Sequence, residues 1–119
     1  MTRARPIAAG VALALLAAVA SAQDGFRVTH TVDRGNPGQT RINGVVFNEN
    51  RFDAVDVYVT AEALDGNGKT VARGISFVSP SIGPGRSASF SASVPVMPGA
   101  TTYRVRVSSY RFGFGQQSP

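Results

Sequence analysis

The fold class is decided by the stretch from Val55 to Gly68, which reads VDVYVTAEALDGNG. Up to Ala63, small apolar residues stand at every second position, and mostly polar residues stand between them. This period of two is typical of a β-strand with one buried face. The closing residues, Asp65 to Gly68, include Gly and Asn, which tolerate the positive φ angles of tight hairpins. The stretch therefore predicts a strand followed by a turn into an antiparallel neighbour.

Similar alternating segments lie on both sides of this stretch. They cover residues 26–33, 40–48, 69–79, 87–95 and 103–112. Gly74 predicts either a bulge or a break in its strand, and Pro95 places its strand at a sheet edge or ends it. The alternation slips at Ser108-Ser109, which predicts a second bulge. Because no segment has a helical period, the sequence predicts an all-β protein, an antiparallel immunoglobulin-like sandwich of six to seven strands.

The N-terminal residues have the three parts of a secretory signal peptide. Arg3 and Arg5 supply positive charge, an apolar run extends from Ile7 to Val19, and Ala20-Ser21-Ala22 is a small-residue cleavage motif. An uncleaved membrane anchor is the alternative, but a spanning helix needs about 20 apolar residues, and this run is shorter. The sequence therefore predicts cleavage after Ala22.

Cleavage at this position defines the expected domains and location. Residues 1–22 are the signal peptide, and residues 23–119 form a single β-sandwich domain that is periplasmic or secreted. Within that domain, residues 110–119 either complete the last strand or form a flexible tail. After cleavage we expect no transmembrane anchor. The chain contains no Cys, so we also expect neither a lipid anchor nor a disulfide.

The processed chain differs in composition from the precursor. Of 119 residues, 97 remain, and ten basic against seven acidic residues give a net charge of +3 instead of +5. These 97 residues include 13 valines but a single leucine, Leu64, and branching at Cβ favours strands. Arg104 and Arg106 share one strand face, but two arginines do not form a nucleic-acid track. We therefore expect no nucleic-acid partner.

No arrangement of residues predicts an enzyme. His30 is the only histidine, and no motif places a nucleophile or carboxylate beside it, so we interpret it as a structural or surface residue. The turn from Asp65 to Gly68 lacks the later Glu of a calcium loop. No serine lies in the G-x-S-x-G motif of a nucleophilic serine. The sequence therefore predicts no catalytic residue, no metal site and no cofactor.

Several of these patterns occur together in a known family. They are the run Ile42-x-Gly44-x-Val46-x-Asn48, the alternating valines, the Asp65–Gly68 turn, the run Ile82-Gly83-Pro84-Gly85, and Phe90. In this order they resemble the FxLYD-type immunoglobulin-like domains of bacteria, and the resemblance covers about residues 42–107. Ala61, Ala63, Leu64 and Asp65 stand where that family has Phe, Leu, Tyr and Asp, so only Asp65 matches. The resemblance implies an extracytoplasmic immunoglobulin-like module without an active site.

The C-terminal aromatic segment supplies the candidate binding residues. They are Tyr110, Arg111, Phe112 and Phe114, and aromatic and Arg side chains are enriched at interface hot spots. The alternative interpretation is that Tyr110 and Phe112 complete the core while Phe114 lies in a flexible tail.

Two functions remain open from the sequence. The first is a non-catalytic exported module that binds another envelope protein, for instance through an exposed strand edge. The alternative is a soluble binder of a small ligand or envelope polymer, which would use the loops around residues 48–52 and 79–86. The partner, the ligand and the oligomeric state are not encoded in any motif.

Overall fold

The computed structural model describes residues 19–34 and 37–113. These residues form seven strands and no helix: β1 (Val19–Gln23), β2 (Phe26–Asp33), β3 (Gln39–Asn48), β4 (Ala54–Leu64), β5 (Thr70–Ile82), β6 (Ser87–Pro95) and β7 (Thr102–Phe112). Sheet A has the order β1-β2-β3-β6 and sheet B the order β5-β4-β7. All strand pairs are antiparallel. The prediction of an all-β, antiparallel fold with six to seven strands is therefore confirmed.

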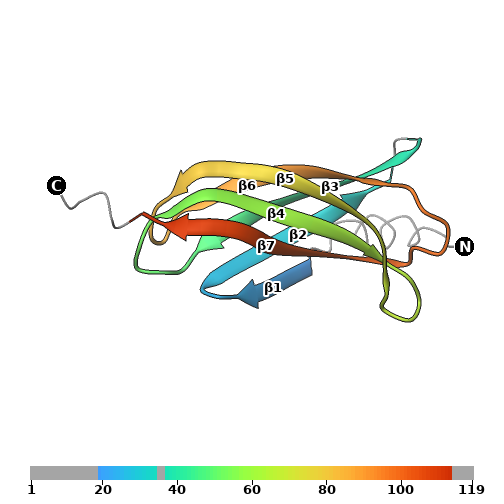
Figure 1. The fold of residues 1–119 in the computed structure, drawn as a ribbon, viewed down its shortest axis with the longest axis horizontal. Coiled ribbons are helices and arrows are strands. Elements are labelled where there is room, and N and C mark those ends of the chain that lie inside the picture. Colours follow the sequence, from blue (N-terminus) through green and yellow to red (C-terminus); the bar gives the residue numbers. More distant parts are fainter. Residues whose placement is uncertain (1–18, 35–36, 114–119) are drawn as a thin grey trace, which may run out of the picture.

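The chain crosses three times between the two sheets. Strands β1 to β3 follow one another in sheet A, β4 and β5 form a hairpin in sheet B, β6 returns to pair with β3, and β7 pairs with β4. Figure 1 shows the three strands of sheet B in front of sheet A, with both sheets running along the long axis of the molecule. The core lies between the layers, as in other two-sheet proteins.

The core consists mainly of small side chains. Val57, Val59, Ala61 and Ala63 of β4 are fully buried, so this part of the predicted inward row is confirmed. Facing residues of sheet A complete the core, with Phe26 and Phe90 as its buried aromatic side chains. Because Ala and Val fill little volume, the two sheets must approach closely to exclude voids.

The predicted inward row is wrong at its start. Ala54 is buried and Val55 only partly so, because the backbone changes phase at Asp56, whose φ is 53°. The register of β4 against β7 shifts at this point, and it shifts again where Tyr58 lies opposite Ser109 but Val59 lies opposite Val107. This second shift confirms the bulge predicted at Ser108-Ser109.

Strand β5 is longer than expected, and its register against β4 shifts twice, between Val57 and Tyr58 and between Ala63 and Leu64. It continues through Pro80 to Ile82, beyond the expected end at residue 79, because Ile82 is buried and pairs with Ala54. Pro80 is tolerated because β5 lies at the edge of sheet B. Gly74 marks neither a break nor a bulge, since it pairs in regular register with Ala61.

Gly74 instead permits a close approach between the sheets. A Cβ atom at this position would lie 2.0 Å from the carbonyl oxygen of Ser93 in β6. Two residues along, the hydroxyl of Ser76 donates to the carbonyl oxygen of Ser91 at 3.1 Å. The side of the sandwich that contains β5 and β6 is therefore closed by direct contact of β5 with the backbone of β6.

Strand β1 was not predicted from the sequence, and it spans the predicted cleavage position. Its first four residues belong to the predicted signal peptide, most of which, residues 1–18, lies outside the described part of the chain. The side-chain amide of Gln23 donates to the carbonyl oxygen of Val107 at 2.7 Å and accepts from its N–H at 3.0 Å.

Over the described ranges, the chain contains no helix that could cross a membrane.

The close approach at Gly74 predicts a strong effect of one added methyl group. Gly74→Ala should lower the free energy of unfolding by about 1–3 kcal/mol, because backbone must move to admit the Cβ. Gly66→Ala is the matched control, since no atom lies within 4 Å of a Cβ there; it should change stability by less than about 0.5 kcal/mol. Urea denaturation followed by circular dichroism measures both, and equal stabilities would contradict this account of the close approach.

Candidate functional site

The candidate site is the outer face of sheet B, where large apolar and charged side chains stand side by side. Alternate residues of each strand point away from the core, and the strand register aligns them in three rows across the sheet. The rows are Arg73–Glu62–Arg104, Ile75–Thr60–Arg106 and Phe77–Tyr58–Ser109. One end of the face is therefore strongly charged and the other is apolar.

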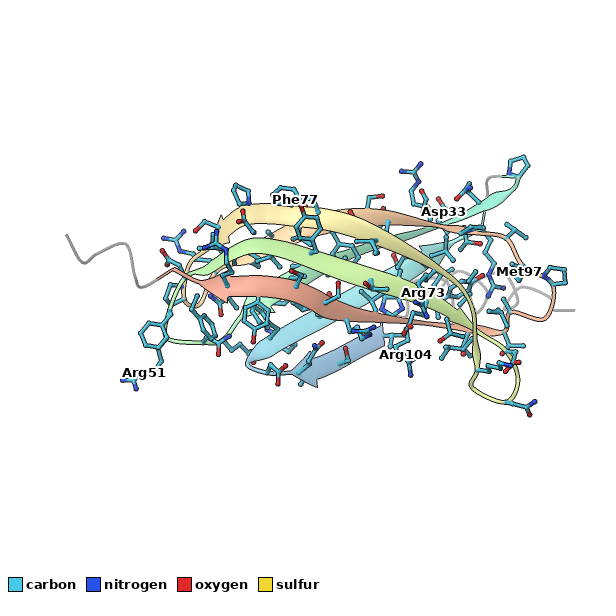
Figure 2. All side chains as sticks on the ribbon, viewed as in Figure 1. Asp33, Arg51, Arg73, Phe77, Met97 and Arg104 are labelled. Atoms are coloured by element: carbon cyan, nitrogen blue, oxygen red, sulfur yellow. The ribbon has the colours of Figure 1, made fainter. Side chains whose placement is uncertain are left out.

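The apolar part consists of Tyr58, Ile75 and Phe77, which we call the apolar patch. Ile75 is 68% exposed, Phe77 48% and Tyr58 38%. The rings of Tyr58 and Phe77 meet edge to face with centroids 5.2 Å apart, a geometry that aromatic pairs favour. Phe77 stands on β5, and Arg73 and Arg104 lie farther along the same sheet toward the β4–β5 turn (Figure 2).

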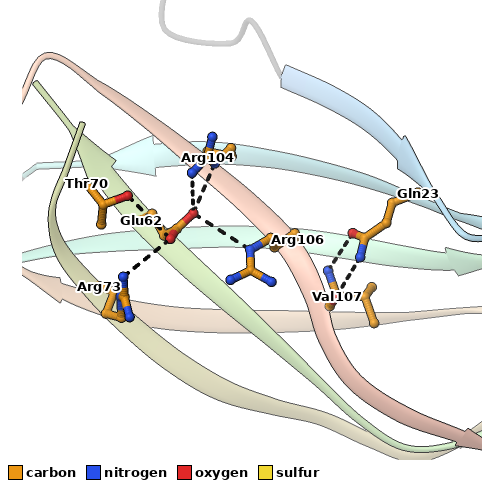
Figure 3. A network of polar contacts seen from close by, with 7 residues as sticks. All are labelled: Gln23, Glu62, Thr70, Arg73, Arg104, Arg106 and Val107. Atoms are coloured by element: carbon orange, nitrogen blue, oxygen red, sulfur yellow. Dashed lines mark hydrogen bonds and ion pairs between the residues drawn. The ribbon is translucent and has the colours of Figure 1, made fainter. Parts of the chain in front are cut away.

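The charged part is organised around Glu62, and its three arginines, Arg73, Arg104 and Arg106, are the arginine cluster. Glu62 Oε1 accepts from Nε and Nη2 of Arg104 at 3.0 and 2.8 Å. Arg106 Nε lies 3.8 Å from the same oxygen, and Arg73 Nη2 lies 3.8 Å from Oε2. Figure 3 shows the three arginines converging on the carboxylate, with Thr70 donating to Oε2.

The arginine cluster determines the charge state of Glu62. Its side chain is only 5% exposed, and this burial by itself raises the pKa of the carboxyl group. The hydrogen bonds from Arg104 and the positive charges of Arg104, Arg106 and Arg73 outweigh that effect, so the pKa of Glu62 is lowered from 4.5. One carboxylate against three guanidinium groups leaves this end of the face with two excess positive charges.

The outer face of sheet A has a different character. Its rows combine Thr29, Thr31 and Asn43 with the serines of β6. Its largest apolar side chain, Phe47, lies under the guanidinium of Arg27 at 3.9 Å from the ring centroid. Small hydroxyl side chains keep a sheet face hydrated, so this surface offers no counterpart to the apolar patch.

The sequence-predicted binding residues lie at the far end of β7. Tyr110 packs edge to face on the buried ring of Phe26, with centroids 4.8 Å apart, and Phe112 packs on Tyr110 at 5.3 Å. Arg111 is exposed and pairs with Asp56 at 2.7 Å, and Phe114 lies outside the described residues. The structure thus packs Tyr110 against the core, places Phe112 on the ring of Tyr110 and leaves Arg111 at the surface.

His30 lies in the core rather than at a surface site. It is 4% exposed, and its Nε2 has no hydrogen-bond partner among the described residues. Burial lowers the pKa of His30 below 6.5 because the charged form loses its hydration. No group of three or more His, Cys, Asp or Glu side chains in the described part of the chain could hold a metal ion.

The two loops expected to hold a ligand meet at one end of the sandwich. Asn48 joins them: its side-chain amide donates to the carbonyl oxygens of Phe52 and Ile82 at 2.9 and 2.8 Å, and its backbone N–H donates to Arg86. An open hollow lies beside them, lined by Ser81, Ile82, Gly83, Pro84, Arg86 and Ser87. Since the buried amide of Asn48 is already bonded within the protein, it provides no free group for a ligand.

The sequence interpretation missed the apolar patch because β5 reverses the usual pattern. Gly74 and Ser76 face the core, while Ile75 and Phe77 face outward. Large apolar residues normally mark the buried face of a strand. Small and large residues alternate from Arg73 to Phe77. This alternation indicates an outward-facing apolar row only if the small residues are expected to lie at a close contact between the sheets.

Comparison of the chain with protein-family models, with curated proteins and with solved structures found no match.

The arginine cluster predicts a cost for neutralising Glu62. Glu62→Gln should lower the free energy of unfolding by about 1–2 kcal/mol, because three partly exposed arginines lose their shared counter-charge. Glu49→Gln is the control, since Glu49 pairs with Arg27 at the exposed surface; it should cost less than about 0.5 kcal/mol. Urea denaturation at neutral pH compares the two, and equal small effects would show that Glu62 contributes no more than a surface pair. In the wild-type protein, the ionised Glu62 makes its full contribution to the free energy of unfolding above pH 4.5. This contribution is lost as the pH falls through the lowered pKa of Glu62.

His30 predicts a separate acid sensitivity. Because its pKa is lower in the folded state, the unfolded chain binds more protons below pH 6.5, so stability should fall as the pH drops from 6.5 toward that lowered pKa. His30→Leu removes the titrating group, and its stability should stay level in that interval. Thermal melts across a pH series distinguish the two proteins, and parallel curves would assign the sensitivity to other groups.

Proposed function

We propose that this protein is an exported, non-catalytic immunoglobulin-like module that binds another protein of the cell envelope through the outer face of sheet B. The observation that carries the proposal is the apolar patch beside the arginine cluster. Exposed apolar groups rimmed by polar ones are typical of interaction sites. Aromatic residues and Arg also contribute most of the binding energy at protein interfaces. The face presents both kinds of residue on a rigid sheet.

The export part of the proposal is supported by the sequence of residues 1–22. The positive residues, the apolar run and the small-residue motif occur there in the order of a signal peptide. Gln23, the first residue after the expected cleavage, holds β7 through its side chain. A chain that begins at this residue would therefore retain the link between the two sheets.

The immunoglobulin-like part is supported by the strand connections. In sheet A, β3 pairs with β6, and in sheet B, β4 pairs with β7, so each sheet gains a strand from later in the chain. Greek-key connections between two antiparallel sheets are characteristic of immunoglobulin-like sandwiches. Membership of the FxLYD type rests on the motif resemblance alone.

Site-specific photo-crosslinking tests the proposed face. With p-benzoylphenylalanine at position 77, irradiation of cells should produce a discrete adduct with an envelope protein, because this ring stands in the apolar patch. The same group at position 89, on the outer face of sheet A, should produce no such adduct. Ile75→Ser combined with Tyr58→Ser should weaken the adduct at position 77. Equal adducts at both positions, or none at position 77, would overturn the proposal.

A further inference from the structure

We infer that the outer edge of β7 accepts an extended segment of a partner protein as an additional strand, and that this segment alternates acidic and apolar side chains. The inference rests on the proposed function and specifies the chemistry of the partner. It uses the side of sheet B next to the arginine cluster.

The edges of the sandwich are not equally open. On one side, β5 and β6 approach so closely that the Gly74 position and the Ser76 hydroxyl contact backbone carbonyls of β6. On the other side, β7 ends sheet B and pairs with β4 alone among the described strands, while β1 and β2 of sheet A approach it from the other layer. β7 runs for 11 residues, which is long for an edge strand. A long edge presents a row of backbone donors and acceptors to a further strand.

One residue already forms strand-like bonds with this edge. The carboxamide of Gln23 donates to the carbonyl oxygen of Val107 and accepts from its N–H (Figure 3). These are the two bonds that a paired strand would offer. Because N–H and C=O groups of alternate residues point to the same side of a strand, those of Val105 and Tyr103 face the same edge.

The side chains along β7 set the chemistry of the added strand. Arg104 and Arg106 project from the outer face, while Val105 and Val107 are buried. Side chains of a strand paired with β7 would lie about 5 Å from these residues on each face. Since the arginine cluster carries two excess positive charges, acidic side chains are favoured on its face. Apolar side chains are favoured on the face of Val105 and Val107.

The same charges disfavour a second copy of this chain at the edge. Antiparallel pairing of β7 with itself about Val105 would place Arg104 directly opposite Arg106 twice. Like charges directly opposite each other destabilise a strand pair, and charged side chains on edge strands prevent self-association. The occupant is therefore a different chain with the opposite charge.

Designed peptides test this inference on the purified, processed protein. An end-blocked fluorescent peptide alternating Glu and Val, of the length of β7, should bind in a fluorescence anisotropy titration. A Lys–Val peptide should bind about tenfold more weakly, because charges then repel. A Glu–Val peptide N-methylated along its backbone keeps its charges but cannot pair, and it should also bind about tenfold more weakly. Hydrogen exchange of the Val105 and Val107 amides should slow when the unmodified peptide binds.

Three variants locate the site. Arg104→Gln combined with Arg106→Gln should remove the preference for Glu over Lys. Arg41→Gln, on the outer face of sheet A, should leave the preference unchanged. Gln23→Ala frees the Val107 backbone without touching an arginine, so it should tighten peptide binding several-fold.

The outcomes separate this inference from the proposed function. Equal binding of the N-methylated peptide, or no binding of any peptide, overturns strand addition at β7. If a crosslink at position 77 still forms in that case, the proposed outer face stands without the edge. Conversely, a peptide that slows hydrogen exchange at the Val105 and Val107 amides supports strand addition at β7. This holds even when position 77 forms no adduct and the proposed binding face is contradicted.

Discussion

Gly74 brings β5 so close to β6 that a single added carbon would lie 2.0 Å from the Ser93 carbonyl oxygen. The rest of the sandwich depends on this spacing. The inner row of β4 is made of Val and Ala, and side chains of this size fill the interior only when the sheets lie close together. The chain has no Cys and hence no covalent link between the layers. Packing, together with hydrogen bonds such as that from Ser76 to Ser91, therefore maintains the inter-sheet distance.

The close approach also determines which side chains reach the surface. Where β5 passes over β6, only small groups fit on its inner side, so Gly74 and Ser76 face inward. The period of two then directs Ile75 and Phe77 outward. The apolar patch is thus a geometric consequence of a tight inter-sheet contact. Selection for binding can act on the identity of these two residues, but their direction is fixed by their small neighbours.

The sequence predicted the features that depend on local patterns. Alternation gave the fold class, and the slip at Ser108-Ser109 gave a bulge that the register of β7 contains. The prediction failed at Val55, where a left-handed backbone at Asp56 changes which residues face inward. It failed again after Ser79, because the burial of Ile82 depends on pairing with distant Ala54. Such non-local pairings leave no periodic signal in a single segment.

The candidate site was harder to predict than the fold. Arg104 and Arg106 were correctly placed on one outward face, but Arg73 and Glu62 join them only through strand pairing. Conversely, the aromatic segment from Tyr110 to Phe112 resembled a binding motif in sequence, yet Tyr110 packs on Phe26. Composition along one strand cannot distinguish a core aromatic residue at a sheet end from an exposed one.

Strand β1 has a consequence for biosynthesis. It pairs residue by residue with β2 from Val19 to Gln23, and the bond between Ala22 and Gln23 lies within that ladder. A processing enzyme needs an accessible, extended substrate, and a bond held in a folded sheet is exposed only by local unfolding. If the chain is cut after Ala22, cutting either precedes this pairing or requires β1 to detach from β2. The rate of cutting would then depend on how long β1 stays unpaired, which would make the timing of folding part of the processing step.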